Sequence, residues 1–396
     1  MAKTVLIAAG GTGGHVFPGL ATAAALRRVH PDLAVEFVGT AERLEATLVP
    51  KVGFTLHTVP AIQLARGFSP STLKLPFVLA SAVRRVVALI REREVVAAVG
   101  FGGYTSVPLA LAARLTRTPL VVHEQNAIAG LANRLAARAA TAVAVSYEEA
   151  MGSFGGTPTV LTGNPVRPDL LPEPARADDL SGAQIREVLR PQGLDTFGLD
   201  RDRRTLLVFG GSQGAQRINE ATAASATLWA DPGGIQILHA TGARSHDESR
   251  IAWLGQGIDP DGRAQSEGLK VVCTEFIDRM DLAYAAADVV VCRAGASSIA
   301  ELTALAVPSI LVPYPHATAD HQTANAMALQ RVGGAVVIAD ENLDAGTLVG
   351  AAQPLLRDRM AYAAMQTRAA EFGRPEAAVD LASLITSVFA GQGRPT

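Results

Sequence analysis

The sequence predicts an α/β protein built from two doubly wound, parallel-sheet domains. Short apolar, β-branched runs alternate with longer Ala- and Leu-rich segments along the whole chain, which is typical of buried parallel strands separated by helices. The 396 residues exceed what one compact core holds and favour two domains of about 150–200 residues each. Residues 6–14 align with residues 206–214, so each half opens with a strand, a glycine-rich turn and a helix.

Six strands are expected in each half, and their carboxyl ends are expected to carry the ligands. Those of the first half are 4–9, 35–39, 95–101, 120–124, 142–146 and 160–163. Those of the second half are 205–210, 236–241, 270–275, 288–292, 309–313 and 335–339. Two domains of this kind that face each other predict an active site in the cleft between them.

The expected domain boundary lies near residue 166. Residues 1–166 form the first domain and residues 167–374 the second. A polar stretch, 172–204, is interpreted as a linker or surface insertion with one short helix near 183–189. The tail, 375–396, begins with a proline suited to a first helical position and continues with apolar residues at helical spacing. We expect this terminal helix to pack back on the first domain.

Composition excludes several classes of function. The formal net charge is −2 and aromatic residues are 5% of the chain, so nucleic acid is not expected as a partner. Cys273 and Cys292 lie in apolar runs and are interpreted as core thiols, and no spacing of ligand-type residues suggests a metal site. No apolar stretch reaches the ~18–20 residues that cross a bilayer, and no signal peptide is visible. We therefore expect a protein that is cytoplasmic or attached to a membrane from that side.

The first glycine-rich turn, residues 10–15, points backbone N–H groups and a helix N-terminus at an anion. It is not a dinucleotide fingerprint, because Val16 stands where the third glycine would be and no acidic residue ends the second strand at Thr40. No Lys-Ser or Lys-Thr pair follows any of these turns, so the phosphate loop of NTPases is excluded as well.

Two further turns have the same character. Gly102 and Gly103 follow a strand, and residues 293–301 join a strand to a helix. Within the latter, Ser298 and Glu301 have the spacing of a capping box, which needs no ligand. A cap leaves other N–H groups of the first turn available, so a cap and a ligand site are compatible here.

Nine motifs follow one another in an order that resembles a known family. They are 10–21, 102–104, 123–126, 163–167, 210–215, 275–277, 293–301, 315–317 and 320–322. Together they resemble the MurG family of bacterial peptidoglycan glycosyltransferases, the undecaprenyldiphospho-muramoylpentapeptide β-N-acetylglucosaminyltransferases, over roughly residues 4 to 390. Two stretches look longer than the family pattern, 172–204 and 255–268, and neither interrupts a motif.

The resemblance implies a GT-B fold and a specific reaction. Such enzymes transfer N-acetylglucosamine from UDP-N-acetylglucosamine to the C4 hydroxyl of the muramoyl sugar of lipid I, with inversion, and so form lipid II. The resemblance implies no cofactor and no metal. Helix N-termini and oriented donors would then stabilise the leaving diphosphate.

The resemblance also implies which residues contact UDP-N-acetylglucosamine. Glu301 matches the position that binds the ribose hydroxyls, for which two acceptor oxygens are well suited. Ile277 matches a position beside the uracil, Ser212 a diphosphate contact and Gln322 a contact with the donor sugar. The remaining implied donor contacts are Thr12, Gly13, Gly14, Asn126, Arg167, Ala296, Ser297, Ser298, Ile299 and Ala300.

His15 is the candidate general base, because an inverting displacement must remove the proton of the acceptor hydroxyl and imidazole titrates near neutral pH. The alternative is that His15 only caps the helix or contacts phosphate. Glu124 is a second catalytic candidate, and His123, His316 and His321 are further alternatives for the base.

Residues 73–93 combine apolar residues with flanking bases, among them Phe77, Arg84 and Arg85. This composition suits an anionic membrane surface, and the alternative is an amphipathic helix that packs on the core. The family acts at the cytoplasmic face of the cell membrane as a peripheral protein, which favours the membrane.

Three other functions share the fold or the donor. A related glycolipid glycosyltransferase would use the same kind of nucleotide sugar, and the motifs at 123–126 and 163–167 favour the peptidoglycan enzyme over it. A UDP-N-acetylglucosamine 2-epimerase would need no lipid acceptor. A silent nucleotide-sugar-binding scaffold would bind the donor without glycosylating any acceptor.

Overall fold

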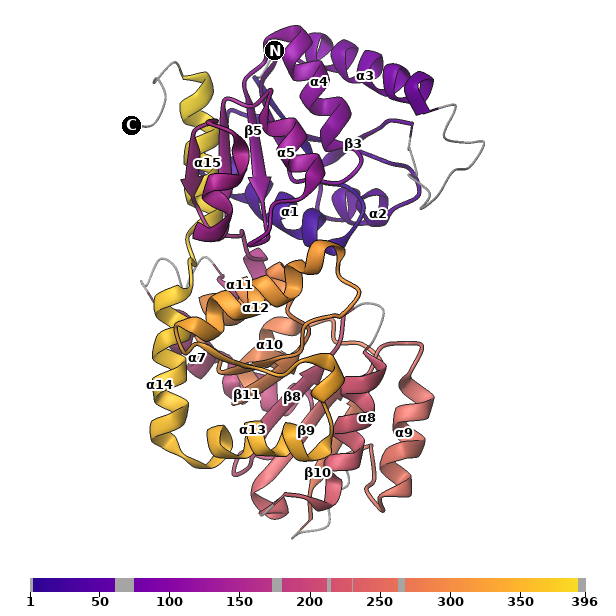
Figure 1. The fold of residues 1–396 in the computed structure, drawn as a ribbon, viewed down its shortest axis with the longest axis vertical. Helices are drawn as coiled ribbons and strands as arrows, with labels where there is room; N and C mark the ends of the chain where they lie inside the picture. The colour runs from indigo at the N-terminus through magenta and orange to yellow at the C-terminus, as the bar shows by residue number, and fades with distance from the viewer. Residues whose placement is uncertain are drawn as a thin grey trace. The chain divides into compact units, whose positions relative to one another are not determined.

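The computed structural model describes residues 3–60, 75–172, 180–211, 215–229, 231–262 and 268–390. The chain divides into two units (Figure 1). Unit 1 comprises Met1–Pro168 and Glu376–Thr396, and unit 2 comprises Asp169–Pro375. Arg167 therefore belongs to unit 1.

Unit 1 is built on a seven-stranded parallel sheet with the order β3-β2-β1-β4-β5-β6-β7. Six of its strands were expected from the sequence. The strands are β1 Thr4–Ala8, β2 Ala34–Gly39, β3 Thr55–Thr58, β4 Val95–Gly100, β5 Leu120–Glu124, β6 Ala142–Val145 and β7 Thr159–Leu161. The unexpected strand is β3, a four-residue edge strand with no apolar run.

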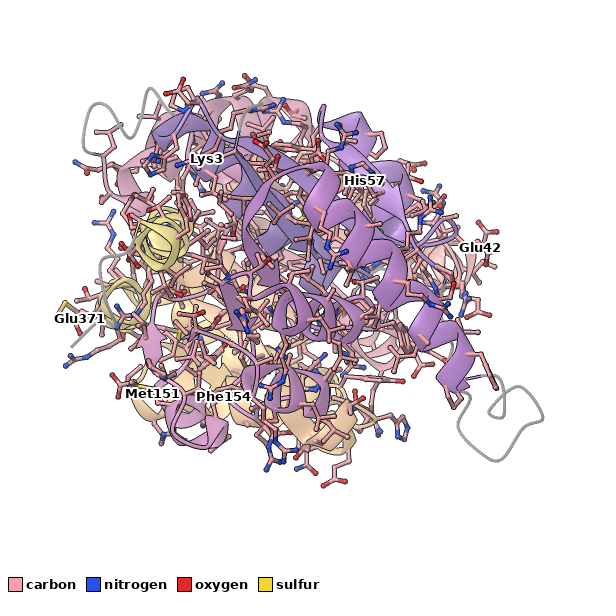
Figure 2. The ribbon with its side chains drawn as sticks, turned by 90° about the horizontal axis from the view of Figure 1, so that it is seen from above. Lys3, Glu42, His57, Met151, Phe154 and Glu371 are labelled. Atoms are coloured by element: carbon pink, nitrogen blue, oxygen red, sulfur yellow. The ribbon has the colours of Figure 1, made fainter. Side chains whose placement is uncertain are left out.

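Helices cover both faces of this sheet because alternate strand residues point to opposite sides. Val5 and Ile7 pack with one set of helices, whereas Leu6 and Ala8 pack with the other. The helices are α1 Gly13–Val29, α2 Leu44–Lys51, α3 Leu75–Glu92, α4 Ser106–Thr116 and α5 Leu131–Ala137, with the 3-10 helix η2 Glu148–Phe154. Helices α3, α4 and α5 lie on one face, where their buried side chains form one cluster with those of β1 and β4. Figure 2 draws the side chains of the molecule seen from above and labels Met151 and Phe154 of η2.

The C-terminal helix, α15 (Ala377–Phe389), belongs to unit 1. Leu381 and Ile385 are fully buried in the same core as α1. In Figure 1 this yellow helix lies among the indigo and magenta elements of unit 1. It begins two residues after Pro375, with Glu376 as its N-cap residue, so Pro375 does not occupy the expected first helical position.

Unit 2 is built on a six-stranded parallel sheet with the order β10-β9-β8-β11-β12-β13. Each of these strands was expected from the sequence. They are β8 Arg204–Phe209, β9 Ile235–Ala240, β10 Lys270–Thr274, β11 Val289–Cys292, β12 Ser309–Leu311 and β13 Ala335–Val337. The first strand of each unit is central and pairs with the fourth, so the two units repeat one topology, as the aligned glycine-rich segments predict.

The helices of unit 2 again cover both faces of the sheet. Helices α8, α9 and α13 share one buried cluster with β8 and β9. The helices are α7 Gly182–Thr196, α8 Gln216–Ala224, α9 His246–Gly255, α10 Met280–Ala286, α11 Ala296–Ala304, α12 His321–Arg331, α13 Ala345–Arg357 and α14 Arg359–Phe372.

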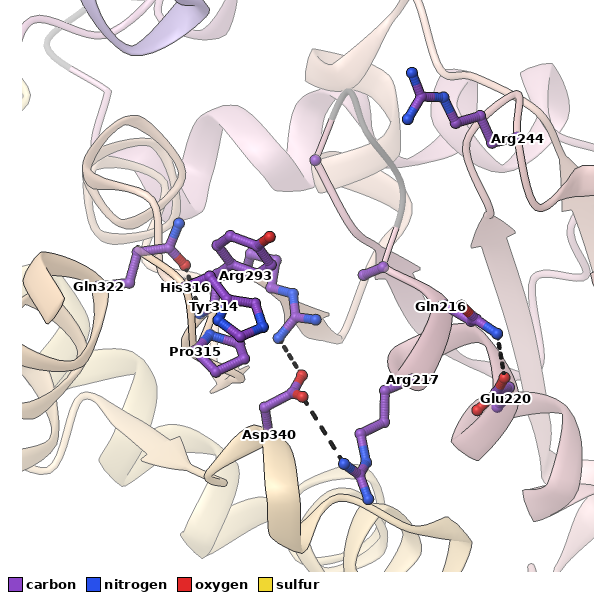
Figure 3. Close-up of a pocket in the computed structure, with 12 residues that line it drawn as sticks. Gln216, Arg217, Glu220, Arg244, Arg293, Tyr314, Pro315, His316, Gln322 and Asp340 are labelled. Atoms are coloured by element: carbon purple, nitrogen blue, oxygen red, sulfur yellow. Dashed lines mark hydrogen bonds and ion pairs between the residues drawn. The ribbon is translucent and has the colours of Figure 1, made fainter. Parts of the chain in front are cut away.

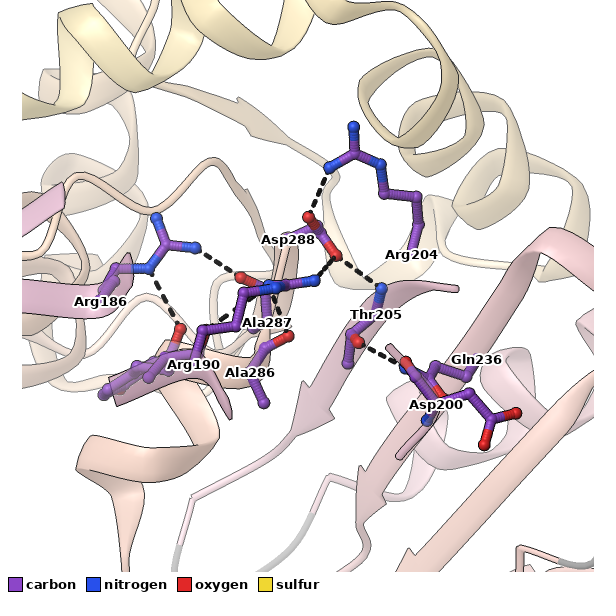
Figure 4. Close-up of polar contacts among 11 residues, drawn as sticks. Arg186, Arg190, Asp200, Arg204, Thr205, Gln236, Ala286, Ala287 and Asp288 are labelled. Atoms are coloured by element: carbon purple, nitrogen blue, oxygen red, sulfur yellow. Dashed lines mark hydrogen bonds and ion pairs between the residues drawn. The ribbon is translucent and has the colours of Figure 1, made fainter. Parts of the chain in front are cut away.

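Within the polar stretch 172–204, the described residues 180–204 hold a longer helix than the expected linker with one short helix. Its helix α7 spans 15 residues, begins with a capping box formed by Ser181 and Gln184, and packs on α10. The buried Arg186 donates to the carbonyls of Tyr284 (3.1 Å), Ala287 (2.5 Å) and Ala306 (3.0 Å) (Figure 4). A guanidinium at the C-terminal end of α10 matches the negative end of that helix.

A second arginine of α7 reinforces this contact. Arg190 donates to Ala286 O (2.9 Å) and to Asp288 Oδ2 (2.9 Å), and Asp288 also accepts from Arg204 and from the backbone of Thr205 (Figure 4). Helix α7 is therefore part of the folded body of unit 2.

Gly193→Ala is expected to destabilise unit 2 by about 1–3 kcal/mol, because a Cβ there would collide with the carbonyl oxygen of Leu282 where α7 crosses α10. Gly350→Ala in α13 is the matched control. No heavy atom lies within 4 Å of the Cβ it would add, so this change is expected to stabilise by about 0.5–1 kcal/mol. Chemical denaturation of the two variants gives the comparison, and equal midpoints would contradict the close packing of α7 on α10.

Both cysteines are core thiols, as the sequence predicts. Cys273 and Cys292 are free and buried in β10 and β11, and burial raises the pKa of the Cys273 thiol to about 11. Among the described helices, none is both long and apolar enough to cross a membrane.

Candidate active site

In unit 1 the candidate residues gather where β1 and β4, adjacent in the sheet, end. The loop after β1 leads into α1, with Thr12 as the exposed N-cap residue and Gly13 and Gly14 as the first two helical residues. His15 follows and is half-buried. The N–H of His15 donates to the carbonyl of Thr12 at 3.0 Å. The N–H groups of Gly13 and Gly14 open the helix, which is where a helix N-terminus binds an anion.

The ring of His15 is held by the backbone of its own loop. Nδ1 lies 3.3 Å from the carbonyl oxygen of Gly10 and 3.5 Å from Thr12 Oγ1. A carbonyl can only accept a hydrogen bond, so Nδ1 carries the proton and the lone pair of the neutral ring is on Nε2. This tautomer suits a base that acts through Nε2.

Glycines let the loop after β4 lie against His15. A Cβ on Gly103 would stand 2.5 Å from the Gly10 carbonyl oxygen, and a Cβ on Gly102 would stand 3.1 Å from His15 Nε2. Both residues also have positive φ, 98° at Gly102 and 75° at Gly103, which favours glycine. Ser106 Oγ fixes the loop by bonding both the N–H and the carbonyl of Gly102 at 2.8 Å.

The glycine-rich loop after β1 is further fixed by Glu45, which sequence reasoning did not single out. Glu45 is 1% exposed. One carboxylate oxygen accepts from Gly11 N (3.0 Å), and the other accepts from Thr40 N (3.0 Å) and Thr40 Oγ1 (2.8 Å). The Gly11 N–H is therefore already hydrogen-bonded within the protein. An anion bound at this loop would instead meet the N–H groups at the start of α1.

Glu124, the second catalytic candidate, organises the loop after β5. Its carboxylate is buried and accepts four hydrogen bonds: from Asn126 N (3.0 Å), Asn126 Nδ2 (3.2 Å), Gly130 N (2.9 Å) and Asn133 Nδ2 (2.9 Å). All four donors are N–H groups, so both oxygens act as acceptors. This geometry favours a positioning role over proton transfer, and it holds Asn126 through both its backbone and its side chain.

His123 has both ring nitrogens engaged. Nε2 donates to Gly163 O (2.9 Å), and Nδ1 accepts from the amide of Gln125 (3.0 Å). Burial lowers the pKa of His123 to about 4, against a smaller opposing effect of the Gly163 carbonyl, so the ring is neutral near pH 7. His123 is therefore a structural link between β5 and the turn at Gly163, which leaves His15 as the favoured base in unit 1.

Arg167 lies close to the first turns of α1. Its guanidinium stacks over the ring of Phe17 at 5.4 Å, and guanidinium is the side-chain cation best suited to phosphate recognition. Unit 1 thus brings His15, Asn126, Arg167 and the start of α1 to the carboxyl edge of one sheet.

In unit 2 the corresponding edge carries α11, whose first residue is Ala296 and whose N-cap residue is Gly295. The expected capping box at Ser298 is wrong, because the helix begins earlier and places Ser298 in its third position. Ser297 and Ser298 are half-buried in the first turn, and Ile299 is buried beneath them. Ala300 is half-buried.

Glu301 is 7% exposed and accepts a hydrogen bond from the hydroxyl of Tyr284 (2.9 Å). Ile277 is buried in the loop after β10, where Thr274 Oγ1 donates to the carbonyl of Phe276 (3.1 Å). Ser212 lies outside the described residues.

Gln322 borders a pocket of about 840 Å³, which falls within the range of small-molecule sites (Figure 3). The N–H of Tyr314 donates to Gln322 Oε1 at 2.9 Å, so the amide NH₂ of Gln322 is turned outward as a donor. Arg293 and Asp340 form a 2.5 Å ion pair in the pocket wall, and Arg217 stands 4.0 Å from the same carboxylate.

The remaining histidine candidates belong to unit 2. His316 lines this pocket and stacks edge-on with Tyr314 at 5.6 Å, whereas Nδ1 of His321 donates to Thr318 O at 2.6 Å. Across the described ranges, no three of the residue types His, Cys, Asp and Glu gather as a metal-binding group.

Comparison with known proteins decides the family. Residues 5–145 match the glycosyltransferase family 28 N-terminal domain, and residues 205–381 match its C-terminal domain. The chain is 41% identical over 390 residues to the UDP-N-acetylglucosamine–N-acetylmuramyl-(pentapeptide) pyrophosphoryl-undecaprenol N-acetylglucosamine transferase of Nocardioides sp., covering 98% of both chains. This chain belongs to the MurG family of glycosyltransferase family 28.

Solved structures agree with this assignment. The MurG crystal structure from Acinetobacter baumannii matches with a TM-score of 0.73 and 28% identity over 97% of this chain and 99% of that chain. The architecture is therefore the GT-B fold predicted from the sequence. The UDP-N-acetylglucosamine 2-epimerase of Neisseria meningitidis, solved with UDP-N-acetylglucosamine bound, matches with a TM-score of 0.67 over 98% of this chain and 99% of that chain. At 11% identity this second match bears on the fold alone.

The two family domains leave residues 146–204 between them. That interval contains the 15-residue helix α7. Helix α7 therefore lies outside the ranges that match the two family domains. Two residues beside the candidate site also escaped sequence reasoning, Glu45 and Tyr284. Each forms a hydrogen bond with a residue distant in the sequence, Glu45 with Gly11 and Tyr284 with Glu301, and no local sequence motif predicts such a bond.

Proposed function

We propose that this chain transfers N-acetylglucosamine from UDP-N-acetylglucosamine to the C4 hydroxyl of the muramoyl-pentapeptide of lipid I, giving lipid II with inversion at the sugar. The observation that carries the proposal is the 41% identity to the Nocardioides enzyme over 98% of both chains. The name of that relative specifies both the donor and the undecaprenol-linked acceptor.

His15 acts as the general base of this reaction. The C4 hydroxyl gives its proton to Nε2 of His15, its oxygen attacks the anomeric carbon of the donor, and UDP departs with the electron pair of the broken bond. The Gly10 carbonyl supports this role, because it holds the Nδ1 proton and keeps the lone pair on Nε2. Thr12, Gly13, Gly14, Asn126 and Arg167 supply polar contacts from unit 1.

Unit 2 binds the donor. Glu301 accepts hydrogen bonds from the ribose hydroxyls, the backbone near Ile277 contacts the uracil, and the first turn of α11, residues 296–300, faces the diphosphate together with Ser212. Gln322 donates to a hydroxyl oxygen of the sugar, since its own carbonyl oxygen is occupied by Tyr314 N–H. The N-terminus of α11 supplies the electrostatic stabilisation that a departing diphosphate needs.

A transfer assay tests the proposal. The purified chain is given radiolabelled UDP-N-acetylglucosamine with and without a lipid I analogue, and we expect label in the lipid fraction only when the analogue is present. Label that stays in the nucleotide fraction while the free sugar nucleotide epimerises would replace the transferase by the 2-epimerase. In a parallel reaction with diacylglycerol in place of the analogue, label in the lipid would identify the glycolipid enzyme instead. Donor binding with no transfer in any reaction would identify the silent scaffold.

The acceptor is a membrane lipid, and we propose that helix α3 docks the chain on the cytoplasmic face of the cell membrane as a peripheral protein. The inner face of α3 is core, with Ala82 and Val86 buried on the sheet. Its outer face carries Phe77, which is 77% exposed, together with the exposed Arg84 and Arg85. Residues 73 and 74 of the predicted membrane segment lie outside the described residues.

Phe77→Asp combined with Arg84→Glu and Arg85→Glu is expected to weaken binding to anionic vesicles about tenfold or more, since each base near such a surface contributes about 1 kcal/mol. Vesicle co-sedimentation measures this. Met360→Asp in unit 2 is the matched control, because Met360 is 79% exposed and the variant should bind as the parent does. Retention of the triple variant on vesicles would rule out α3 as the docking surface.

A further inference from the structure

Tyr284 is a fully buried phenol whose hydroxyl touches the residue expected to bind the ribose. Its side chain is 0% exposed, and its hydroxyl donates to Glu301 Oε2 at 2.9 Å. A tyrosine in an Ala-rich helix ordinarily serves as core packing. This one also places a hydrogen-bond donor on a buried carboxylate.

We propose that Tyr284 is a positioning residue for Glu301. The carboxylate offers about four lone-pair sites, and Tyr284 occupies one of them and thereby fixes the rotation of the group. With its plane fixed, the carboxylate presents its remaining acceptor sites to the vicinal hydroxyls of a ribose in one orientation. This inference rests on the proposed function, because it takes Glu301 as the ribose contact.

The position of Tyr284 is itself determined by two contacts and by the close packing of the helix that carries it. Phe209, the last residue of β8, packs edge-on against its ring at 6.1 Å. Arg186 of α7 donates to its backbone carbonyl at 3.1 Å. About two turns further along α7, Gly193 lets this helix approach α10 closely at Leu282.

These contacts indicate that α7, which lies between the two family domains in the sequence, helps to position Tyr284. Arg186 ties α7 to α10 through the carbonyls of Tyr284 and Ala287, and to the turn after α11 through the carbonyl of Ala306. Because α10 carries Tyr284 and α11 carries Glu301, one guanidinium braces both helices of the pair. A group held this firmly loses little entropy when ligand binds.

The test compares two ligands on two variants. Titration calorimetry measures the affinity of the full chain for UDP and for 2′-deoxy-UDP. In the parent protein we expect UDP to bind more tightly. In Tyr284→Phe, which keeps the ring and removes only the hydroxyl, we expect UDP affinity to fall about 3–10-fold and the preference for UDP over 2′-deoxy-UDP to shrink by a similar factor.

Tyr362→Phe is the control, because it removes a hydroxyl from α14 of the same unit, outside the binding machinery, and should change neither affinity. In steady-state assays Tyr284→Phe should raise KM for UDP-N-acetylglucosamine and leave kcat within about twofold, since a positioning loss on the ribose is felt in binding.

The outcomes separate this inference from the proposed function. If UDP fails to bind the parent protein, the proposed function itself fails. If the parent discriminates between the two nucleotides and Tyr284→Phe weakens both equally, the hydroxyl serves packing alone and the inference is overturned. If Glu301→Ala keeps the full discrimination, Glu301 is not the ribose contact and Tyr284 has nothing to position.

Discussion

Replacing His15 by alanine is expected to lower kcat by about 10²–10⁴-fold, the usual contribution of a general base, while UDP affinity stays within about twofold. The physical reason is the tautomer: with the Nδ1 proton held at the Gly10 carbonyl, Nε2 is the nitrogen that accepts the proton of the acceptor hydroxyl. The measurement combines transfer kinetics on a lipid I analogue with calorimetric binding of UDP.

Three further measurements sharpen this result. Added imidazole should restore part of the activity of His15→Ala, because it can occupy the space beside Gly102 and Gly103 that the ring vacates. His316→Ala and His321→Ala should keep kcat within about tenfold if neither is the base. A His15→Ala variant with more than a tenth of the parental kcat would return His15 to the role of a helix cap or phosphate contact.

The fold was predictable where burial is achieved by apolar side chains. Every expected strand of unit 2 formed, because each is a run of residues covered on both faces. Strand β3 was missed because Thr55, His57 and Thr58 interrupt any apolar signal, and an edge strand pairs with only one neighbour.

Helix α7 was underestimated for a related reason. Its docking depends on Arg186 and Arg190, which satisfy the carbonyls at the C-terminal end of α10. In the sequence, arginines in a polar stretch indicate a solvated surface, and only the three-dimensional structure brings the helix end to them. The same limit explains Glu45, whose acceptors serve Gly11 and Thr40 across two loops.

At the candidate site, the motifs predict which loops carry the site but do not assign the roles within them. His123 and Glu124 lie within three residues of Asn126 in the sequence, and all three residue types suit an active site. Their hydrogen bonds distinguish the roles of these residues. Both ring nitrogens of His123 and both carboxylate oxygens of Glu124 are hydrogen-bonded to other protein groups. His15 is distinguished by the contacts of Nδ1 with Gly10 O and Thr12 Oγ1, a feature that spacing alone does not reveal.

Glu124→Gln is expected to destabilise unit 1 by about 2–6 kcal/mol, about 1–3 kcal/mol for each of two buried N–H donors that lose their acceptor. An amide has one acceptor oxygen, so in either orientation its NH₂ faces two N–H donors. One orientation opposes Asn126 N and Nδ2, and the other opposes Gly130 N and Asn133 Nδ2. Buried donors left without acceptors carry their full desolvation cost.

The same substitution distinguishes positioning from catalysis. If Glu124 only organises the loop, then stability and kcat/KM fall together, and UDP binding by unit 2 is unaffected. Glu148→Gln, an exposed glutamate of η2, is the matched control and should alter neither quantity. A Glu124→Gln protein as stable as the parent with kcat reduced 10²-fold or more would instead make Glu124 the base, and the four donors around it would then be the groups that hold a catalytic carboxylate in place.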